Sequence, residues 1–282
     1  MKFLSLSFLA LVGFNGVIWQ GVIERLRDVP LEVYFLDVGQ GDSQLIVFPD
    51  GVKVLIDGGP TKEVLFELGE ILFPTDRYID LVMITHAQLD HYGGIKDVIQ
   101  RYKVGAFIFN SEEGEGEAWD EFKRILKEEK VPIIVLGEGD KVSYKDKQIN
   151  VLSPSEGLLA HRDLNEGSLV TELVGEGVKI LFTGDIGFEA EEVLLEKYDM
   201  DIDVLKVAHH GSKYSTSMSF LEEATPLISV VEVGDNRFGH PTEATLQRLA
   251  GIGSTIYRTD KNGRVKLTIE SGRVGVKTEL AN

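Results

Sequence analysis

The sequence predicts an α/β fold, an αββα sandwich in which two mixed β-sheets pack together and helices cover their outer faces. Three observations predict it. From Leu31 onward, short β-branched and apolar runs alternate with amphipathic segments. Closely spaced turn residues between several of these runs are typical of hairpins. Both halves of the chain pass from strands to helices, which favours two similar layers that bury one sheet against the other.

The first half is expected to begin with two strands that flank a Gly-Gln-Gly-Asp turn, followed by a Pro-Asp-Gly turn into a third strand. A helix and a buried strand come next, and the alternation then continues. The expected strands are 31–38, 43–48, 52–57, 79–85, 102–109 and 131–136, the helices are 61–72 and 118–129, and a hairpin lies within 140–152. The second half repeats this sense with the runs SLVTELV and VKILFTGD, a helix from Glu189, IDVLKVAHHG, and further strand–helix pairs as far as Thr268.

An apolar segment precedes the expected domain. Residues Phe3–Trp19 form a run of about 17 residues, at the lower edge of what spans a bilayer. We expect residues 1–30 to be an uncleaved membrane anchor and residues 31–282 to form the folded domain. A cleaved signal peptide, which would leave the domain secreted, is the alternative, and a buried first helix is the third possibility. Arg25 and Arg27 after the segment favour a cytoplasmic domain by the positive-inside rule.

Composition narrows the possible chemistry. The formal net charge of the 282-residue chain is −17, so its overall field repels polyanions, and a phosphate substrate would need local neutralisation, for example by a bound cation. The chain contains no cysteine, which excludes disulfide-linked partners, a thiol nucleophile and thiolate metal ligands. Metal ligands must therefore come from His, Asp, Glu, Asn or Gln.

Histidine and aspartate residues gather directly after the strand-like runs and in the Gly-rich turns beside them. When apolar strands carry such residues at their ends, a fold of this kind brings them together at one rim. Imidazole and carboxylate suit Zn²⁺, Mn²⁺ or iron, and two ions can share one carboxylate. The residues concerned are Asp57, His86, Asp90, His91, Asp185, His209, His210 and His240.

These motifs resemble the metallo-β-lactamase superfamily: His86-x-x-x-Asp90-His91 before Gly93-Gly94, the Asp57-Gly58-Gly59 turn, and Thr183-Gly184-Asp185. A narrower resemblance is to the extracytoplasmic hydrolase domain of ComEC-type DNA-uptake proteins, and it extends from about Leu31 to Thr268. It rests on the segments LDVGQGDS, SLV at Ser168, AHHGSKYSTS, GHP and YRTDKNG.

The resemblance implies a ligand set. One ion would bind Asp90 and His91, with Asp185 as the bridging carboxylate and His209 as the further imidazole. His210 and His240 stay open as alternatives to His209. The other ion would bind His86, but Gln88 and Asn165 stand where relatives supply stronger ligands, and amide oxygens are weak, uncharged ligands. The ions, one or two per chain, would be zinc or manganese.

The resemblance also implies a function: a metal-dependent phosphodiesterase or nuclease that acts through a metal-bound hydroxide, with single-stranded DNA as a candidate substrate. Asp90 or Asp57 would orient the water or the ligands, and a non-ligating His210 or His240 would polarise the substrate or protonate the leaving group. The residues expected near the substrate are Lys213, Gln40 and Asp42.

Two other functions stay possible from sequence. One is hydrolysis of cell-envelope phosphodiesters, and the other is a catalytically weak, membrane-tethered binding module, which Gln88 supports. The ComEC-type resemblance favours a domain outside the cytoplasm, in conflict with Arg25 and Arg27.

Overall fold

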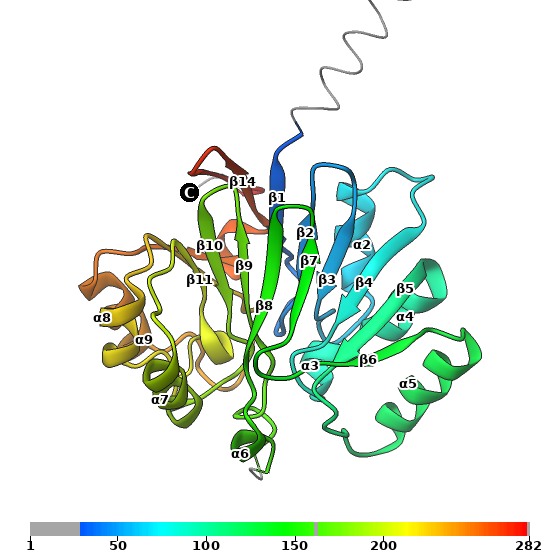
Figure 1. The fold of residues 1–282 in the computed structure, drawn as a ribbon, viewed down its shortest axis with the longest axis horizontal. Coiled ribbons are helices and arrows are strands. Elements are labelled where there is room, and N and C mark those ends of the chain that lie inside the picture. Colours follow the sequence, from blue (N-terminus) through cyan, green and yellow to red (C-terminus); the bar gives the residue numbers. More distant parts are fainter. Residues whose placement is uncertain (1–28, 161–162, 281–282) are drawn as a thin grey trace, which may run out of the picture.

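The computed structural model describes residues 29–160 and 163–280. Figure 1 shows two sheets side by side, with helices on both outer sides. The predicted anchor, Phe3–Trp19, lies outside the described residues. Among the helices that the structure describes, none is both long and apolar enough to cross a membrane.

The first sheet has eight strands. Its strands β1 to β3 are antiparallel neighbours, whereas β3 to β6 run parallel. In spatial order the strands are β15 (Arg273–Thr278), β14 (Val265–Glu270), β1 (Leu31–Phe35), β2 (Gln44–Val47), β3 (Lys53–Ile56), β4 (Tyr78–Met83), β5 (Lys103–Phe109) and β6 (Ile133–Val135).

The second sheet has seven strands. Its strands β7 to β10 are antiparallel neighbours and β10 to β13 run parallel. In spatial order the strands are β13 (Thr255–Arg258), β12 (Ile228–Val231), β11 (Val204–Lys206), β10 (Val178–Phe182), β9 (Val170–Gly175), β8 (Lys147–Ser153) and β7 (Lys141–Tyr144). Both sheets are therefore mixed, as predicted.

Helices cover the outer face of each sheet. In Figure 1, α2, α4 and α5 lie on the outer side of the first sheet, and α7, α8 and α9 lie on the outer side of the second. The helices are α2 (Glu63–Ile71), α3 (Leu89–Tyr92), α4 (Ile95–Arg101), α5 (Glu117–Glu128), α6 (Glu156–Leu159), α7 (Phe188–Lys197), the 3₁₀ turn η1 (Ala208–Gly211), α8 (Met218–Ala224), α9 (Glu243–Gly251) and α10 (Thr259–Asn262). The layer order, helix–sheet–sheet–helix, confirms the predicted fold class.

Three layers of apolar side chains hold these elements together. The central one fills the space between the sheets and includes Phe35, Ile46 and Phe182. Each outer one joins a sheet to its helices. In α5, Trp119 and Phe122 recur at a spacing of three and are buried, which is the pattern of a helix with one apolar face. The sheets are therefore buried on both faces along most of their length, and the polar residues needed for chemistry must lie at the strand ends.

Candidate metal centre

The predicted site residues follow strands that point in the same direction. Asp57 directly follows β3, and His86 lies just beyond the parallel neighbour β4. In the second sheet, Asp185 lies beyond β10, and His210 lies in η1, just beyond the parallel strand β11. Parallel neighbours end at the same edge of a sheet, so both sheets contribute side chains to one rim of the sandwich.

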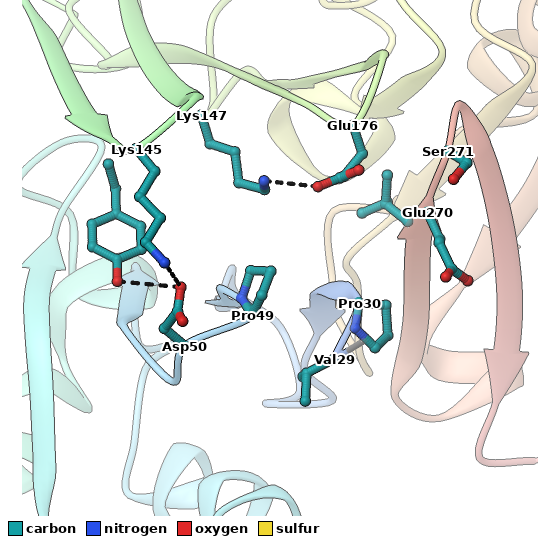
Figure 2. A pocket seen from close by; sticks show the side chains of 11 residues that line it. Val29, Pro30, Pro49, Asp50, Lys145, Lys147, Glu176, Glu270 and Ser271 are labelled. Carbon is teal, nitrogen blue, oxygen red and sulfur yellow. Dashed lines mark hydrogen bonds and ion pairs between the residues drawn. The ribbon is translucent and has the colours of Figure 1, made fainter. Parts of the chain in front are cut away.

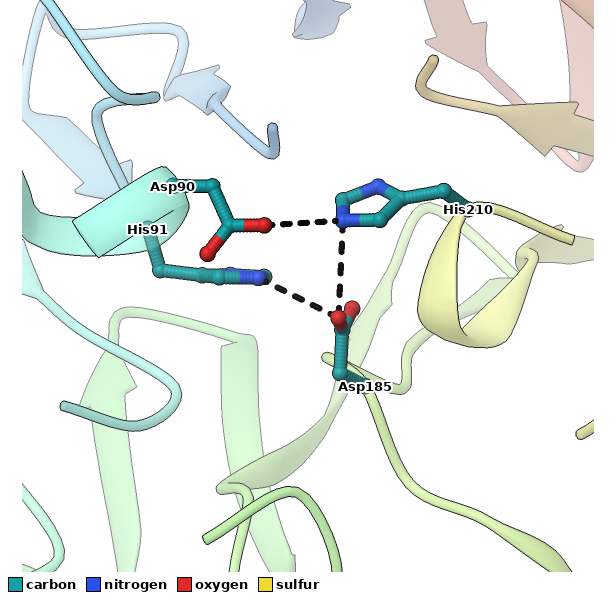
Figure 3. A group of neighbouring side chains, drawn as sticks. All are labelled: Asp90, His91, Asp185 and His210. Carbon is teal, nitrogen blue, oxygen red and sulfur yellow. Dashed lines mark ion pairs between the residues drawn. The ribbon is translucent and has the colours of Figure 1, made fainter. Parts of the chain in front are cut away.

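Four side chains meet at this rim. Asp90 and His91 come from α3, and Asp185 and His210 come from the second sheet; each offers one ligand atom, and these atoms all lie within 4.8 Å of one another. The Nε2 atoms of His91 and His210 are each 3.4 Å from Oδ2 of Asp185, and Nε2 of His210 is also 3.4 Å from Oδ2 of Asp90. Figure 3 shows both imidazoles directed toward the Asp185 carboxylate.

The cluster has the chemistry of a divalent cation site. Within the described part of the chain, Nε2 of His91, Nε2 of His210 and Oδ1 of Asp185 are buried polar atoms without a hydrogen-bond partner. Buried polar atoms almost always have a partner. The two Nε2 atoms both lie near Oδ2 of Asp185, so a cation placed among them would supply the partner that both nitrogens lack. Two imidazoles and two carboxylates suit Zn²⁺, Mn²⁺ or iron. The residues present therefore fit a metal ion.

Each of these imidazoles is held by its other ring nitrogen. Nδ1 of His91 lies 2.8 Å from the Asp57 carboxylate, which in turn accepts from the backbone N–H and the hydroxyl of Thr85, both at 2.8 Å. Nδ1 of His210 donates to the carbonyl oxygen of Glu232 at 3.0 Å, with the Asp42 carboxylate 3.2 Å away. These contacts place the proton of each neutral ring on Nδ1, so that Nε2 would present its lone pair to a metal ion at the centre of the cluster.

Electrostatics at the rim favour a positive charge. Burial opposes ionisation of His91 and His210, but the Asp185 carboxylate, with Asp57 or Asp42, raises the pKa of His91 well above its usual value and that of His210 to about 10. Burial likewise opposes ionisation of Asp185, yet the two imidazoles and Lys206 hold its pKa well below the usual range. The carboxylates thus stabilise cationic charge here, which a proton or a metal ion can supply.

Two charged residues of the rim do not follow from the sequence motifs. Lys206 ends β11 with no exposed area; its ammonium pairs with Asp42, donates to the carbonyl of Gly184 at 2.9 Å and lies 3.7 Å from Oδ1 of Asp185. Glu232 follows β12, is equally buried, and accepts from the backbone N–H of Ser43 at 3.0 Å and from the side chain of Gln44. Each of these residues is a single charged residue within an apolar run of the sequence. Such a residue signals a buried ion pair or hydrogen bond, because a buried charge must have a partner.

Two groups of acidic and imidazole side chains could hold a cation, and the position of the Lys206 ammonium shows which is the better candidate. Asp42, Asp57 and His91 form a second close group, but Asp42 already pairs with Lys206 and Asp57 with His91. The first group is therefore the better candidate for a cation. Asp42, expected near the substrate, has no exposed area and lies behind His210.

Gly41 allows the loop that carries Asp42 to lie close to α3. Gly41 has φ +157, and a β-carbon built there would lie 2.3 Å from the carbonyl oxygen of Asp90. The backbone N–H of Asp42 donates to the same oxygen at 3.2 Å. The loop therefore packs directly against α3. Gln40 instead accepts from the backbone N–H of Gly234 at 3.3 Å, and so connects the loop to the residues after β12.

His86 lies beside the cluster, and the further side chains predicted to bind an ion with it are weak ligands. Its ring centroid is 4.1 Å from that of His91, its Nε2 is buried without a partner among the described residues, and burial together with His91 lowers its pKa to about 3. The two amides predicted as weak ligands lie together: Nε2 of Gln88 donates to Oδ1 of Asn165 at 2.6 Å. These amides therefore bond to each other and join the loop after β4 to the loop before β9.

The two consecutive histidines of η1 differ in position. His210 is buried in the cluster, whereas the His209 side chain is 32% exposed, with Nε2 3.9 Å from Oδ2 of Asp185. Both residues have left-handed backbone, with φ of 49° and 52°, a conformation that costs energy for residues other than glycine and is typical of functional sites. The His240 ring lies 5.7 Å from that of His209, and Lys213 is exposed.

A separate hollow of about 460 Å³ lies at the other end of the strands, where the described chain enters β1 (Figure 2). Turns between strands line it, and both of its lysines are already paired: Lys145 with Asp50, and Lys147 with Glu176 at 2.7 Å. It contains none of the predicted site residues, so the rim cluster stays the candidate site.

Comparison with known proteins settles the family. The sequence model of the metallo-β-lactamase superfamily matches residues 36–234, more than half of the chain. The chain belongs to this superfamily. Metallo-β-lactamase fold proteins bind divalent metal, and the chain is of the metal-dependent hydrolase kind that this superfamily contains.

Two curated relatives of this metallo-β-lactamase superfamily chain are competence proteins. ComE operon protein 3 of Bacillus subtilis is 32% identical over 86% of the chain and 34% of its own length. Competence protein ComA of Neisseria gonorrhoeae is 32% identical over 72% of the chain and 27% of its own length. The chain spans about a third of the length of these relatives. Among solved structures, the metallo-β-lactamase fold protein YhfI from Bacillus subtilis matches 88% of the chain and all of its own, with TM-score 0.59 and 12% identity, which shows the fold.

Proposed function

We propose that this chain is a metal-dependent phosphodiesterase that hydrolyses nucleic acid, with single-stranded DNA as the preferred form. The observation that carries the proposal is the buried cluster of Asp90, His91, Asp185 and His210, with both imidazoles held by their Nδ1 atoms. The names of the competence relatives support a DNA-related substrate. Because the chain covers only a third of those relatives, their whole activity is part of the proposal.

The four residues of the cluster would hold one divalent cation. When bound, such an ion supplies a water of lowered pKa and a positive charge for a phosphoryl oxygen. Asp57 and Asp42 fix the His91 and His210 rings, so that neither imidazole can rotate away from the centre. We assign His210, rather than His209, as the ligating histidine of η1.

The histidines left outside the cluster would serve the substrate. His209 is partly exposed and could donate a proton to the leaving oxygen, and His240 lies beside it, where its neutral ring could hydrogen-bond the substrate. Burial and the neighbouring His209 and His210 lower the pKa of His240. Exposed Lys213, three residues after His210, offers a positive charge to a phosphate in an otherwise acidic chain.

An activity assay on the full purified chain tests the proposal. We expect hydrolysis of bis(p-nitrophenyl) phosphate and of an end-labelled single-stranded oligonucleotide after loading with Mn²⁺, Zn²⁺ or Mg²⁺, and loss of both activities after chelation. Hydrolysis of a phosphocholine diester without hydrolysis of DNA would favour the cell-envelope alternative. Metal-loaded protein that hydrolyses no phosphodiester would contradict the proposal.

One observation favours a second candidate, a catalytically weak binding module. The amides of Gln88 and Asn165 bond to each other at 2.6 Å beside His86, where a second ion would need charged ligands. Such a module would bind the oligonucleotide without cleaving it, and the same experiment separates the two.

A further inference from the structure

A series of rings leads from the metal centre to the surface. Oδ2 of Asp185 is 3.9 Å from Nε2 of His209, and the His209 ring is 5.7 Å from that of His240. The Phe238 ring then stacks on His240, with centroids 5.8 Å apart and planes 20° apart. Phe238 is 72% exposed. One face of this phenyl ring is therefore supported by an imidazole and the other is open to solvent.

The loop holds Phe238 in place through a single side chain. Nδ2 of Asn236 donates to the carbonyl oxygens of Gly234 and His240, each at 2.9 Å, and Oδ1 of Asn236 accepts from the backbone N–H groups of Phe238 and His240, each at 3.1 Å. These four bonds fix the loop on both sides of the phenyl ring. The phenyl ring therefore extends from a fixed backbone, lies against the His240 ring and leaves its other face accessible to a planar ligand.

Two exposed residues of the neighbouring loops carry the positive charge that suits a phosphate backbone. Arg237 precedes Phe238 and is exposed, and Lys213 is exposed in the loop that follows His210. Nζ of Lys213 lies 4.8 Å from the centre of the Tyr214 ring, which is 65% exposed. The chain has net charge −17, and Asp235 in the same loop as Arg237 is also exposed. The two cationic side chains and the two exposed aromatic rings are nevertheless the groups of these loops that suit a nucleic acid strand.

We infer that the open face of Phe238 stacks on a nucleobase of the substrate, next to the phosphodiester that the metal centre cleaves. The inference rests on the proposed function and specifies where a base binds. Flat aromatic faces bind bases of any sequence, and unpaired bases alone have both faces free, so the platform selects single strands.

The same surface does not suit a choline headgroup, the ligand of the envelope alternative. A quaternary ammonium binds among several open aromatic faces. Here the Lys213 ammonium already lies over the Tyr214 ring, and Arg237 adds a second positive charge beside Phe238. Both charges repel a cationic ligand and attract an anionic one.

The test compares two strands on the full, metal-loaded chain: a single-stranded oligonucleotide and a strand of the same length made of abasic deoxyribose phosphates. For Phe238→Ala, we expect the ratio of kcat/KM for the normal strand to kcat/KM for the abasic strand to fall about tenfold or more, mainly through KM. Phe238→Trp should preserve the ratio. Phe73→Ala is the matched control, because Phe73 is 81% exposed but precedes β4, at the opposite end of the strand from His86.

Equal losses of Phe238→Ala on both strands, or no loss on either, would overturn the inference. A greater loss on a phosphocholine diester than on the oligonucleotide would overturn it too. Fluorescence anisotropy of the labelled strands separates this inference from the proposed function, because it reads binding without hydrolysis. If the wild-type chain cleaves nothing but binds the normal strand through Phe238, the proposed function fails and the base platform stands.

Discussion

The Asp185 carboxylate is the residue on which the rim depends most. One oxygen faces the two Nε2 atoms of His91 and His210, and the other faces the Lys206 ammonium. Its charge therefore serves the metal centre and the buried ion pair together. A neutral amide of the same shape would keep the packing and remove that charge.

For Asp185→Asn, we expect loss of bound metal and a fall in kcat/KM of more than about a hundredfold, because the substitution removes a negatively charged metal ligand. Metal content of the purified variant and kcat/KM measure this, and circular dichroism checks the fold. Asp50→Asn, in the turn at the other end of the strands, is the control and should keep both properties. Full metal content in Asp185→Asn would show that Asp185 is no ligand.

Lys206 balances a carboxylate that has no access to water. Replacing it by Met leaves the buried Asp42 with only the His210 and His91 rings as partners, and breaking a buried pair in this way costs about 3–5 kcal/mol. We expect Lys206→Met to lower the free energy of unfolding in urea by that amount, and Asp42→Asn in the same chain to restore part of it. Losses that simply add would mean that the two residues do not act as a pair.

The amide of Gln88 limits the second ion. We expect the wild-type chain to bind about one ion, and Gln88→His or Gln88→Asp to raise the content toward two, since each supplies a stronger ligand beside His86. Elemental analysis after dialysis against Mn²⁺ or Zn²⁺ measures this, with Gln100→His on the exposed face of α4 as the control. Two ions already in the wild type would refute the weak-site hypothesis.

The motifs predicted which residues come together at the rim, because the direction of parallel strands decides which ends meet. They favour His209 as the further imidazole, with His210 as an alternative, whereas the structure brings His210 into the cluster. Both adopt left-handed backbone, so the inward side chain depends on how η1 turns rather than on sequence order. Lys206 and Glu232 were also beyond the motifs, since their partners come from a loop about 160 to 190 residues earlier in the chain.

At the scale of elements, α7 holds the loop that follows the histidines. Glu191 of α7 accepts from the backbone N–H of Thr216 and, at 2.8 Å, from that of Ser217, and its side chain is buried. Burial raises the pKa of Glu191 to about 7, against an ordinary 4.5. The folded state therefore binds a proton that the unfolded state releases between these pH values.

This difference has a definite sign. The stabilisation from protonated Glu191 is present below about pH 4.5 and is lost as the pH rises toward about 7, a change on the order of 3 kcal/mol. The variant Glu191→Gln cannot titrate at this position. The free energy of unfolding of the metal-free wild type should therefore fall relative to that of the variant as the pH rises across this window. Urea denaturation at several pH values measures the difference. A constant difference would mean that Glu191 ionises as freely in the folded state.

The bounds of two elements with a clear apolar periodicity or turn signal were predicted to within one or two residues. The expected helix 118–129 is α5 (Glu117–Glu128), and the expected hairpin within 140–152 is β7 with β8. The short helix α3, which carries Asp90 and His91, has only four residues and no apolar period to reveal it. Its place depends on contacts of the loop at Gly41, which no local pattern contains.

At the scale of the whole molecule, the membrane tether stays a prediction. We expect Phe3–Trp19 to anchor the domain and the domain to lie outside the cytoplasm, which the resemblance to ComEC-type domains favours and Arg25 and Arg27 oppose. Protease added to intact cells tests this: residues 31–282 should be digested before lysis. Digestion only after lysis would place the domain in the cytoplasm.

The position of β14 has a consequence for how the protein acquires its metal. Val265, Leu267 and Ile269 lie in the core between the sheets, and Ile269 pairs with Leu31 of β1, so the last strands complete a sheet that the first strand begins. A ribosome must have made almost all of the domain before this core can close. Until then the two sheets that carry the metal ligands cannot pack together as they do in the folded domain. We therefore expect the ion in the finished enzyme to be one that is abundant in the compartment where folding ends, rather than where translation begins.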